Sequence, residues 1–202
     1  MGASADVVAV ILAGGRGRRL GEPKMQAEID GRPLLEIAIA RATEAGLPAV
    51  VVTKPDTRLP AVAAPVLHEP VEPEHPLLGI VTAMKELPDA QAIVVLGGDL
   101  PFVPVALVRA LAEADGSTVP VAAGRHQPLV ARYERALLPS LEAALADDAS
   151  ITATVRSLGF APLQGARLAL LDPTGHAFMN VNTPDDLTRA RVIAHSWSDR
   201  TQ

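Results

Sequence analysis

The sequence predicts a three-layer α/β fold in which a mostly parallel sheet lies between two layers of helices. Short runs rich in Val and Ile recur along the chain, and they are apolar throughout rather than alternating with polar residues. Such runs are typical of strands that are covered on both faces, as parallel strands are. Helix-like stretches separate these runs, and this alternation indicates βαβ units with right-handed crossovers.

The expected elements follow this alternation most regularly in the first half of the chain. Buried strands are expected at 7–12, 49–53, 66–68 and 92–96. Helices are expected at 33–45, 78–87 and 104–114. In the less regular second half, we expect strands at 118–122 and 127–133 around a turn at Gly124, and a helix at 139–146.

A final helix is expected at 184–195, because its start carries three recognisable residues. Thr183 is the predicted N-cap, Pro184 occupies the first helical position, and Asp186 completes a capping box. The prolines are scattered, and no linker or repeat divides the chain. We therefore expect a single domain at 1–195, followed by a polar tail at 196–202.

The composition excludes several classes of function. Of the 202 residues, 49% are hydrophobic and 20% are charged, which is typical of a globular domain rather than a disordered one. The net charge of −5 and the 2% of aromatic residues disfavour nucleic-acid binding. Without cysteine, there is no disulfide, thiolate zinc site or cysteine nucleophile. The longest apolar run, 7–13, is too short to span a membrane, so a soluble cytoplasmic protein is expected.

The strongest local signal is the loop that follows the first predicted strand. Between positions 14 and 24 it holds four glycines, four cationic side chains and a single acid. Glycine lets backbone amides approach an anion, and the cations attract it. The spacing matches neither common phosphate-loop pattern, because Arg19 and Leu20 stand where glycine is required. The alternative is a surface turn with incidental arginines, but open α/β sheets bind ligands at this end of a strand.

An aspartate follows the strand expected at 92–96. Asp99 comes directly after Gly97 and Gly98, so its carboxylate is expected at the same edge of the sheet as the glycine loop. Mg²⁺ prefers carboxylate ligands, with substrate phosphates completing its coordination. A magnesium-binding Asp99 opposite a basic loop suits phosphoryl or nucleotidyl transfer. The alternative is a turn aspartate that caps the segment 100–104.

Four short strings occur in order between residues 12 and 184. They are Leu-Ala-Gly-Gly at 12–15 with Arg-Leu-Gly at 19–21 and Lys24, Gly-Asp-Leu-Pro at 98–101, Gly-Arg-His-Gln-Pro-Leu at 124–129, and Asn-Val-Asn-Thr-Pro at 180–184. Together they resemble the molybdenum cofactor guanylyltransferases. The first string alone is typical of nucleotidyltransferases in general. The last string narrows the resemblance to the molybdenum cofactor guanylyltransferases. The resemblance implies a Rossmann-like fold of the GT-A nucleotidyltransferase type.

The resemblance also implies a reaction and roles for single residues. The terminal phosphate of Mo-molybdopterin attacks the α-phosphorus of GTP, pyrophosphate leaves, and molybdopterin guanine dinucleotide forms. Lys24 neutralises phosphate charge, Asp99 holds Mg²⁺, and Arg19 is a further phosphate clamp. The nucleotide is bound by the backbone of Leu12, Ala13, Gly14 and Gly15. Molybdoenzymes or their chaperones are implied as protein partners.

Recognition of the base is expected to depend on residues after two other strands. Guanine donates from N1 and N2, so a carboxylate can accept both hydrogens, and Glu69 lies where the family commonly has an aspartate. The alternative is a solvated loop glutamate beside Glu72 and Glu74. Where the family often carries an asparagine near the nucleotide, this chain has Thr53 and Lys54, and either could take its place.

Three further residues are candidates for the pterin side of the site. If 178–182 is extended, Asn180 and Asn182 point to the same face and can bind phosphate or assist the metal. The alternative is that both are ordinary turn asparagines before a capped helix. Arg125 is expected to bind the pterin phosphate or else to be an exposed arginine in a hairpin.

Other functions remain as alternatives at this point. The cytidylyl-transferring relative would use the same loop, Lys24 and Asp99, and would differ in the pocket that reads the base. A sugar-phosphate nucleotidyltransferase usually needs a longer chain. A non-catalytic nucleotide-binding module is disfavoured, because a mere binder needs no metal opposite the α-phosphate. The sequence has no G-x-S-x-G string, which argues against a serine hydrolase.

Overall fold

The protein is built around one large sheet. The computed structural model describes residues 6–14, 20 and 23–198. The strands of the sheet, in spatial order, are β10 (Ala161–Leu163), β7 (Thr118–Ala122), β9 (Val130–Glu134), β6 (Ala92–Gly97), β1 (Val7–Leu12), β4 (Ala49–Thr53) and β5 (Val66–His68). In addition, β8 (Arg125–His126) pairs with β7, and a separate small sheet consists of β2 (Glu28–Ile29) and β3 (Arg32–Pro33).

Strand β1 lies between β6 and β4 and runs parallel to both. Its last residue, Leu12, is level with Gly97 of β6 and with Val52 of β4. Strand β5 continues the parallel arrangement beyond β4, whereas β9 runs antiparallel to β6 and to β7. The carboxyl ends of β1, β4, β5 and β6 therefore meet at one edge of the sheet, and the segments that follow them are neighbours in space.

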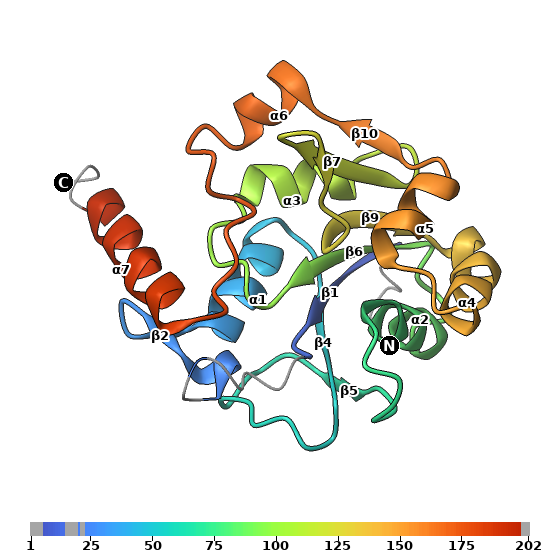
Figure 1. Ribbon diagram of the computed structural model, residues 1–202, viewed down its shortest axis with the longest axis horizontal. Helices are drawn as coiled ribbons and strands as arrows, with labels where there is room; N and C mark the ends of the chain where they lie inside the picture. The colour runs from blue at the N-terminus through green and yellow to red at the C-terminus, as the bar shows by residue number, and fades with distance from the viewer. Residues whose placement is uncertain (1–5, 15–19, 21–22, 199–202) are drawn as a thin grey trace.

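Helices cover both faces of the sheet and complete three layers (Figure 1). One face packs against α1 (Leu34–Glu44), α3 (Val105–Ala112) and α6 (Gly165–Leu171), and the other against α2 (Pro76–Glu86), α4 (Leu138–Ala146) and α5 (Ile151–Ser157). Along β1, the side chains alternate between these layers, with Ala9 and Ile11 in one core and Val10 in the other. All three are fully buried. The predicted three-layer fold with a mostly parallel sheet is confirmed.

The structure differs from the sequence-based expectation at several short or peripheral elements. Strand β5 forms an edge of the sheet, and Val66 is 36% exposed, so the prediction that it is covered on both faces was wrong. Helix α2 begins two residues earlier than expected, because the His75 side chain caps its first turn. The strand expected at 127–133 begins only at Val130. The elements that were not predicted are η1 (Lys24–Gln26), β2, β3, β8, η2 (Arg135–Leu137), α5, β10 and α6.

Helix α7 (Pro184–Ser198) continues three residues beyond the predicted end at 195, so the first part of the expected polar tail is helical. Residues 199–202 lie outside the described part of the chain. Leu187 and Ala190 of α7 share a buried cluster with Ile29 and Phe102, and α7 lies beside β2 in Figure 1. Among the helices that the structure describes, none combines the length and the hydrophobicity needed to cross a membrane.

Arg135 joins the segment after β9 to the end of α2. Its Nε donates to the carbonyl of Ala90 at 2.6 Å, and its Nη2 donates to the carbonyl of Met84 at 2.7 Å and to that of Leu87. The last carbonyls of a helix have no partner within the helix. The Arg135 guanidinium therefore satisfies acceptors at the C-terminus of α2 and holds this helix against the sheet.

Candidate active site

A pocket of about 260 Å³ opens where the carboxyl ends of the inner strands meet the start of α2. The residues of its wall come from the ends of β1, β4, β5 and β6, from the start of α2 and from the segment just before β9. They include Leu12, Gly14, Lys54, Glu69, Gly79 and Asp99. The structure thus brings Gly14 of the glycine loop and Asp99 into the same pocket, as their positions after parallel strands predicted.

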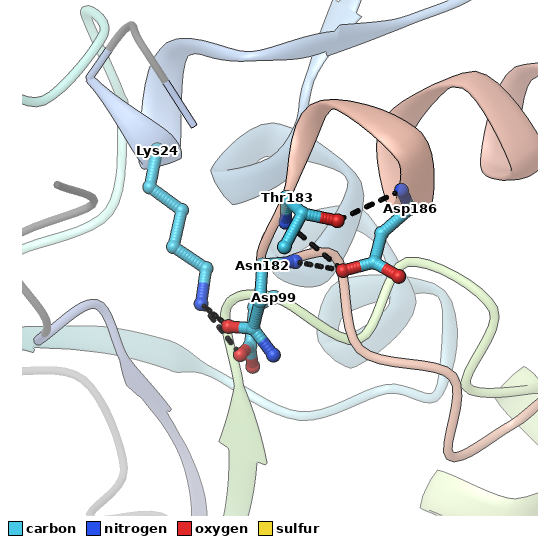
Figure 2. Close-up of polar contacts among 5 residues, drawn as sticks. All are labelled: Lys24, Asp99, Asn182, Thr183 and Asp186. Carbon is cyan, nitrogen blue, oxygen red and sulfur yellow. Dashed lines mark hydrogen bonds and ion pairs between the residues drawn. The ribbon is translucent and has the colours of Figure 1, made fainter. Parts of the chain in front are cut away.

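Lys24, Asp99 and Asn182 come from distant parts of the sequence and lie together in the structure (Figure 2). Lys24 belongs to η1, Asp99 follows β6, and Asn182 precedes α7. The Nζ of Lys24 donates to Oδ2 of Asp99 at 2.7 Å and to Oδ1 of Asn182 at 2.5 Å. The backbone N–H of Val181 donates to the Asp99 carbonyl at 2.9 Å and ties the two segments together. The side chains of Lys24 and Asp99 are 11% and 18% exposed, so this ion pair is shielded but open to a ligand.

The oxygens around the Lys24 ammonium form a donor set that suits a hard cation. A carboxylate oxygen of Asp99 and the carboxamide oxygen of Asn182 already converge on one positively charged atom. Mg²⁺ prefers such oxygen ligands and completes its octahedron with water or substrate phosphates. Within residues 6–14, 20 and 23–198, there is no group of three or more His, Asp or Glu side chains that could hold a metal ion. The residues present therefore fit a metal held jointly by Asp99 and a bound phosphate.

Asp186 fixes the segment that carries Asn182. Its Oδ2 accepts hydrogen bonds from the backbone N–H of Asn182 at 3.0 Å and of Thr183 at 2.9 Å, and the Thr183 hydroxyl accepts from the Asp186 N–H at 3.2 Å (Figure 2). This reciprocal pattern confirms the predicted capping box. The N–H of Asn182, followed by the hydrogen bond with Thr183, lowers the pKa of Asp186 because both stabilise the charged carboxylate.

Lys54 and Glu69 form a second, more deeply buried ion pair in the wall of the pocket. Lys54 Nζ lies 3.3 Å from Glu69 Oε1, and both side chains are 9% exposed. The same ammonium donates to the carbonyls of Pro70 at 2.8 Å and Pro73 at 3.4 Å. The pKa of Glu69 is raised, because the effect of burial exceeds the opposing effects of the Lys54 charge and hydrogen bond. Glu69 is therefore a buried residue of the pocket, and the alternative of a solvated loop glutamate was wrong.

Two glycines lie beside the Glu69 carboxylate, and one of them, Gly79, leaves room for it. A Cβ atom on Gly14 would lie 3.5 Å from Glu69 Oε1. A Cβ atom on Gly79 would lie 2.8 Å from Glu69 Oε2 and 2.9 Å from Leu12 Cδ2, which is too close for either atom to stay in place. Gly79 was not predicted as a site residue. The available signal was its position inside a helical pattern, where an isolated glycine usually has a packing or functional reason.

Thr53 and Lys54, which replace the expected asparagine, have different surroundings. The Thr53 hydroxyl is buried and donates to the carbonyl of Ala13 at 3.4 Å, and the Ala13 N–H donates to the carbonyl of Val52 at 2.8 Å. Thr53 therefore braces β4 against the start of the glycine loop. Of the two residues, Lys54 is the one that lines the pocket.

The remaining predicted site residues are not all brought together. Ala13 is fully buried and contributes no side-chain surface to the pocket wall. Asn180 is exposed, and Arg125 is exposed on β8, apart from the residues that line the pocket. Gly15 and Arg19 lie outside the described part of the chain. The assignment of Asn180 and Arg125 to the pterin side therefore stays a prediction.

This geometry agrees with the similarity of the chain to known proteins. The family model described as MobA-like NTP transferase domain matches residues 9–161. A molybdenum cofactor guanylyltransferase from Rhizobium johnstonii is 33% identical over 204 residues, with 91% of each chain covered. The chain belongs to the molybdenum cofactor guanylyltransferases, within the MobA-like NTP transferases. This membership confirms the resemblance found in the sequence and the prediction that the protein is a nucleotidyltransferase.

Solved structures share the fold of this family member. The molybdopterin-guanine dinucleotide biosynthesis protein A from Archaeoglobus fulgidus has a TM-score of 0.77 at 25% identity and covers 93% of this chain and 98% of its own. The 2-C-methyl-D-erythritol 4-phosphate cytidylyltransferase from Thermus thermophilus has a TM-score of 0.65 at 21% identity, with coverage of 93% and 98%. The second similarity concerns the fold alone. Together they confirm the predicted nucleotidyltransferase fold.

Proposed function

We propose that the protein transfers GMP from GTP to the terminal phosphate of Mo-molybdopterin and so forms molybdopterin guanine dinucleotide. A phosphate oxygen of the acceptor bonds to the α-phosphorus, the bond from that phosphorus to the bridging oxygen breaks, and pyrophosphate leaves. The observation that carries this proposal is the convergence of Lys24, Asp99 and Asn182 beside the pocket that contains Glu69. The name of the Rhizobium relative supports it.

The proposed roles of Lys24 and Asp99 follow from their charges. When bound, Mg²⁺ supplies Lewis-acid polarisation of the phosphates, and Asp99 is the residue proposed to hold it. We expect Lys24 to donate to phosphate oxygens in place of Asp99 and Asn182. Its ammonium then neutralises the charge that develops on the triphosphate. Arg19 is proposed as a further clamp, because a guanidinium can bind phosphate with two hydrogen bonds. The chain thus contributes positioning and charge stabilisation, with no covalent intermediate.

The remaining contacts are divided between the base and the acceptor. Glu69 is proposed to accept hydrogen bonds from N1 and N2 of guanine. The backbone of residues 12–15 is proposed to contact the nucleotide, which the exposure of Gly14 at the pocket supports. Asn180, Asn182 and Arg125 are proposed for the pterin side. Molybdoenzymes or their chaperones are the proposed recipients of the product.

The decisive experiment combines nucleotide binding with turnover. Calorimetry would compare GTP, CTP and ATP with and without Mg²⁺, and pyrophosphate release would then be measured after addition of Mo-molybdopterin. We expect GTP to bind most tightly in the presence of Mg²⁺ and pyrophosphate to appear only with the acceptor. A preference for CTP would indicate the cytidylyl-transferring activity. Binding of GTP without turnover would indicate a non-catalytic nucleotide-binding protein.

A further inference from the structure

The ammonium of Lys54 has several partners within the protein. An ammonium group has three N–H donors. The described residues place three acceptors around Nζ, namely Glu69 Oε1 at 3.3 Å, the Pro70 carbonyl at 2.8 Å and the Pro73 carbonyl at 3.4 Å. All of them belong to the segment 69–73 after β5, so Lys54 holds this segment and the Glu69 carboxylate together.

Within the part of the chain that the structure describes, two glycines also lie beside the Glu69 carboxylate. Gly79 of α2 is next to Oε2, and Gly14 after β1 is next to Oε1. The further titratable side chains in the described wall of the pocket are Asp56 after β4, Glu74 and His75 before α2, and Asp99 after β6. Of the described residues that line this pocket, Lys54 is the one lysine or arginine. Among the described residues, Lys54 is thus the cation paired with Glu69, and Lys24 is the cation paired with Asp99.

The protonation state of a carboxyl group decides which base edge it matches. A carboxylate offers acceptors only, and so it matches the two donors at N1 and N2 of guanine. A protonated carboxyl offers one donor and one acceptor. It matches the neighbouring acceptor and donor at N3 and N4 of cytosine, or at N1 and N6 of adenine. Because burial favours the neutral acid, a buried carboxyl that reads guanine needs a fixed cation beside it.

We propose that Lys54 is a positioning residue for base selection, which holds Glu69 in place as an acceptor-only carboxylate and thereby makes the pocket prefer guanine. This inference rests on the proposed function, in which Glu69 reads the base. Lys54 acts through Glu69 and does not itself contact the nucleotide. Removal of its charge leaves the desolvation of Glu69 uncompensated and raises the pKa of that carboxyl further.

The test compares the kcat/KM ratio of GTP to CTP across pH in the full-length protein with Mg²⁺ and Mo-molybdopterin. In the wild type we expect a ratio that favours GTP and changes less between about pH 6 and pH 8.5 than in a variant without the Lys54 charge, because the ammonium stabilises the ionised form of Glu69. Lys54→Met is expected to lower the ratio by about tenfold or more at pH 6. The ratio of this variant should rise again towards pH 8.5, since one pH unit changes the ionised fraction of the Glu69 carboxyl up to tenfold. Lys54→Arg, which keeps the charge, is expected to retain most of the preference at all pH values.

A matched control is available on the surface of α2. Lys85 pairs with Glu142 of α4 at 2.5 Å, with side chains 55% and 42% exposed, and lies outside the pocket wall. Lys85→Met makes the same chemical change and is expected to leave the ratio and its pH profile unaltered. Glu69→Gln offers one donor and one acceptor at every pH, so its ratio is expected to be low and independent of pH.

The outcomes separate this inference from the proposed function. If Lys54→Met slows GTP and CTP equally and the ratio stays constant with pH, Lys54 is only structural and the inference is wrong. If the wild type shows no guanylyl transfer, the proposed function itself fails. The double variant K54M/E69Q removes both charges of the ion pair. It replaces K54M in the test if K54M does not fold. Its ratio must equal that of E69Q, because a difference would mean that Lys54 contacts the base directly.

Discussion

The Nζ of Lys24 and the Oδ2 of Asp99 lie 2.7 Å apart, although 75 residues separate them in the sequence. The two charges balance each other, and Asn182 shares the ammonium. In the proposed reaction, Lys24 binds phosphate and Asp99 binds the metal in place of their contact with each other. Their loss should therefore affect turnover more strongly than folding.

The first prediction concerns these two residues. We expect Lys24→Ala and Asp99→Ala each to lower kcat by on the order of a hundredfold, the scale for losing one electrostatic stabiliser of a transition state. Pyrophosphate release with GTP, Mg²⁺ and Mo-molybdopterin measures this. Lys85→Ala, on the surface of α2, should have the wild-type rate. A rate close to that of the wild type in either site variant would contradict the role given to that residue.

The second prediction concerns the capping box of α7. We expect Asp186→Ala to lower the free energy of unfolding by about 1 kcal/mol at pH 7, as loss of an N-terminal cap does. Because the folded pKa of Asp186 is lowered, this contribution is present above the unfolded pKa of about 3.9 and is lost as the pH falls through the folded value. Urea unfolding at pH 7 and at about pH 3 should show the difference between variant and wild type shrinking at acid pH.

Asp185→Ala is the matched control for the cap. Asp185 is exposed in the same first turn and shares the favourable interaction with the helix dipole. Its loss should destabilise the protein less than the loss of Asp186. An equal effect of the two substitutions would mean that charge near the helix end, rather than the hydrogen bonds to Asn182 and Thr183, accounts for the stability.

The third prediction concerns Gly79. In a helix without tertiary contacts, Gly→Ala would stabilise by about 1 kcal/mol. Here the new Cβ would collide with Glu69 Oε2 and Leu12 Cδ2, so we expect a destabilisation of about 1–3 kcal/mol, typical of overpacking, and weaker binding of GTP. Calorimetry with GTP and urea unfolding measure both. Gly116→Ala, whose Cβ meets nothing within 4 Å, should bind GTP as the wild type does.

The fourth prediction separates stability from catalysis at Arg135. Its guanidinium satisfies carbonyls of Met84, Leu87 and Ala90, so Arg135→Met should lower the free energy of unfolding by about 1–3 kcal/mol. The KM for GTP should not change, because Arg135 lies outside the described wall of the pocket. Arg109→Met removes one exposed hydrogen bond, to the carbonyl of Glu44, and should have a smaller effect on unfolding. A large change in KM with unchanged stability would contradict the structural role of Arg135.

The inner part of the fold was predictable because its physical requirement appears directly in the sequence. A strand covered on both faces must be apolar throughout, and the predicted bounds of β1 and β4 agree with the structure. Short peripheral elements have no comparable pattern of residues in the sequence. Strand β10 has three residues and α6 has seven, which is too few for a periodic pattern to stand out.

The residues of the candidate site that follow the strands of the sheet were predictable from the sequence. Contacts between residues far apart in the sequence were not. Gly14 and Asp99 were expected together, because parallel strands end at the same edge. The contact between Lys24 and Asn182 depends on the path of the chain before α7, over a separation of 158 residues, and no local pattern reports it. The burial of Glu69 was likewise hidden, since its neighbours in sequence include exposed acids, and only the tertiary structure places Lys54 beside it.

The hydrogen bond from Lys24 to Asn182 also has a consequence for biosynthesis on the ribosome. Translation proceeds from the N-terminus, so Lys24 and Asp99 are made long before Asn182. A nascent chain that has not yet released the segment with Asn182 cannot complete this trio, even when the strands before it have paired. The contact between Lys24 and Asn182 therefore forms only after the segment before α7 has been made and has packed beside Asp99.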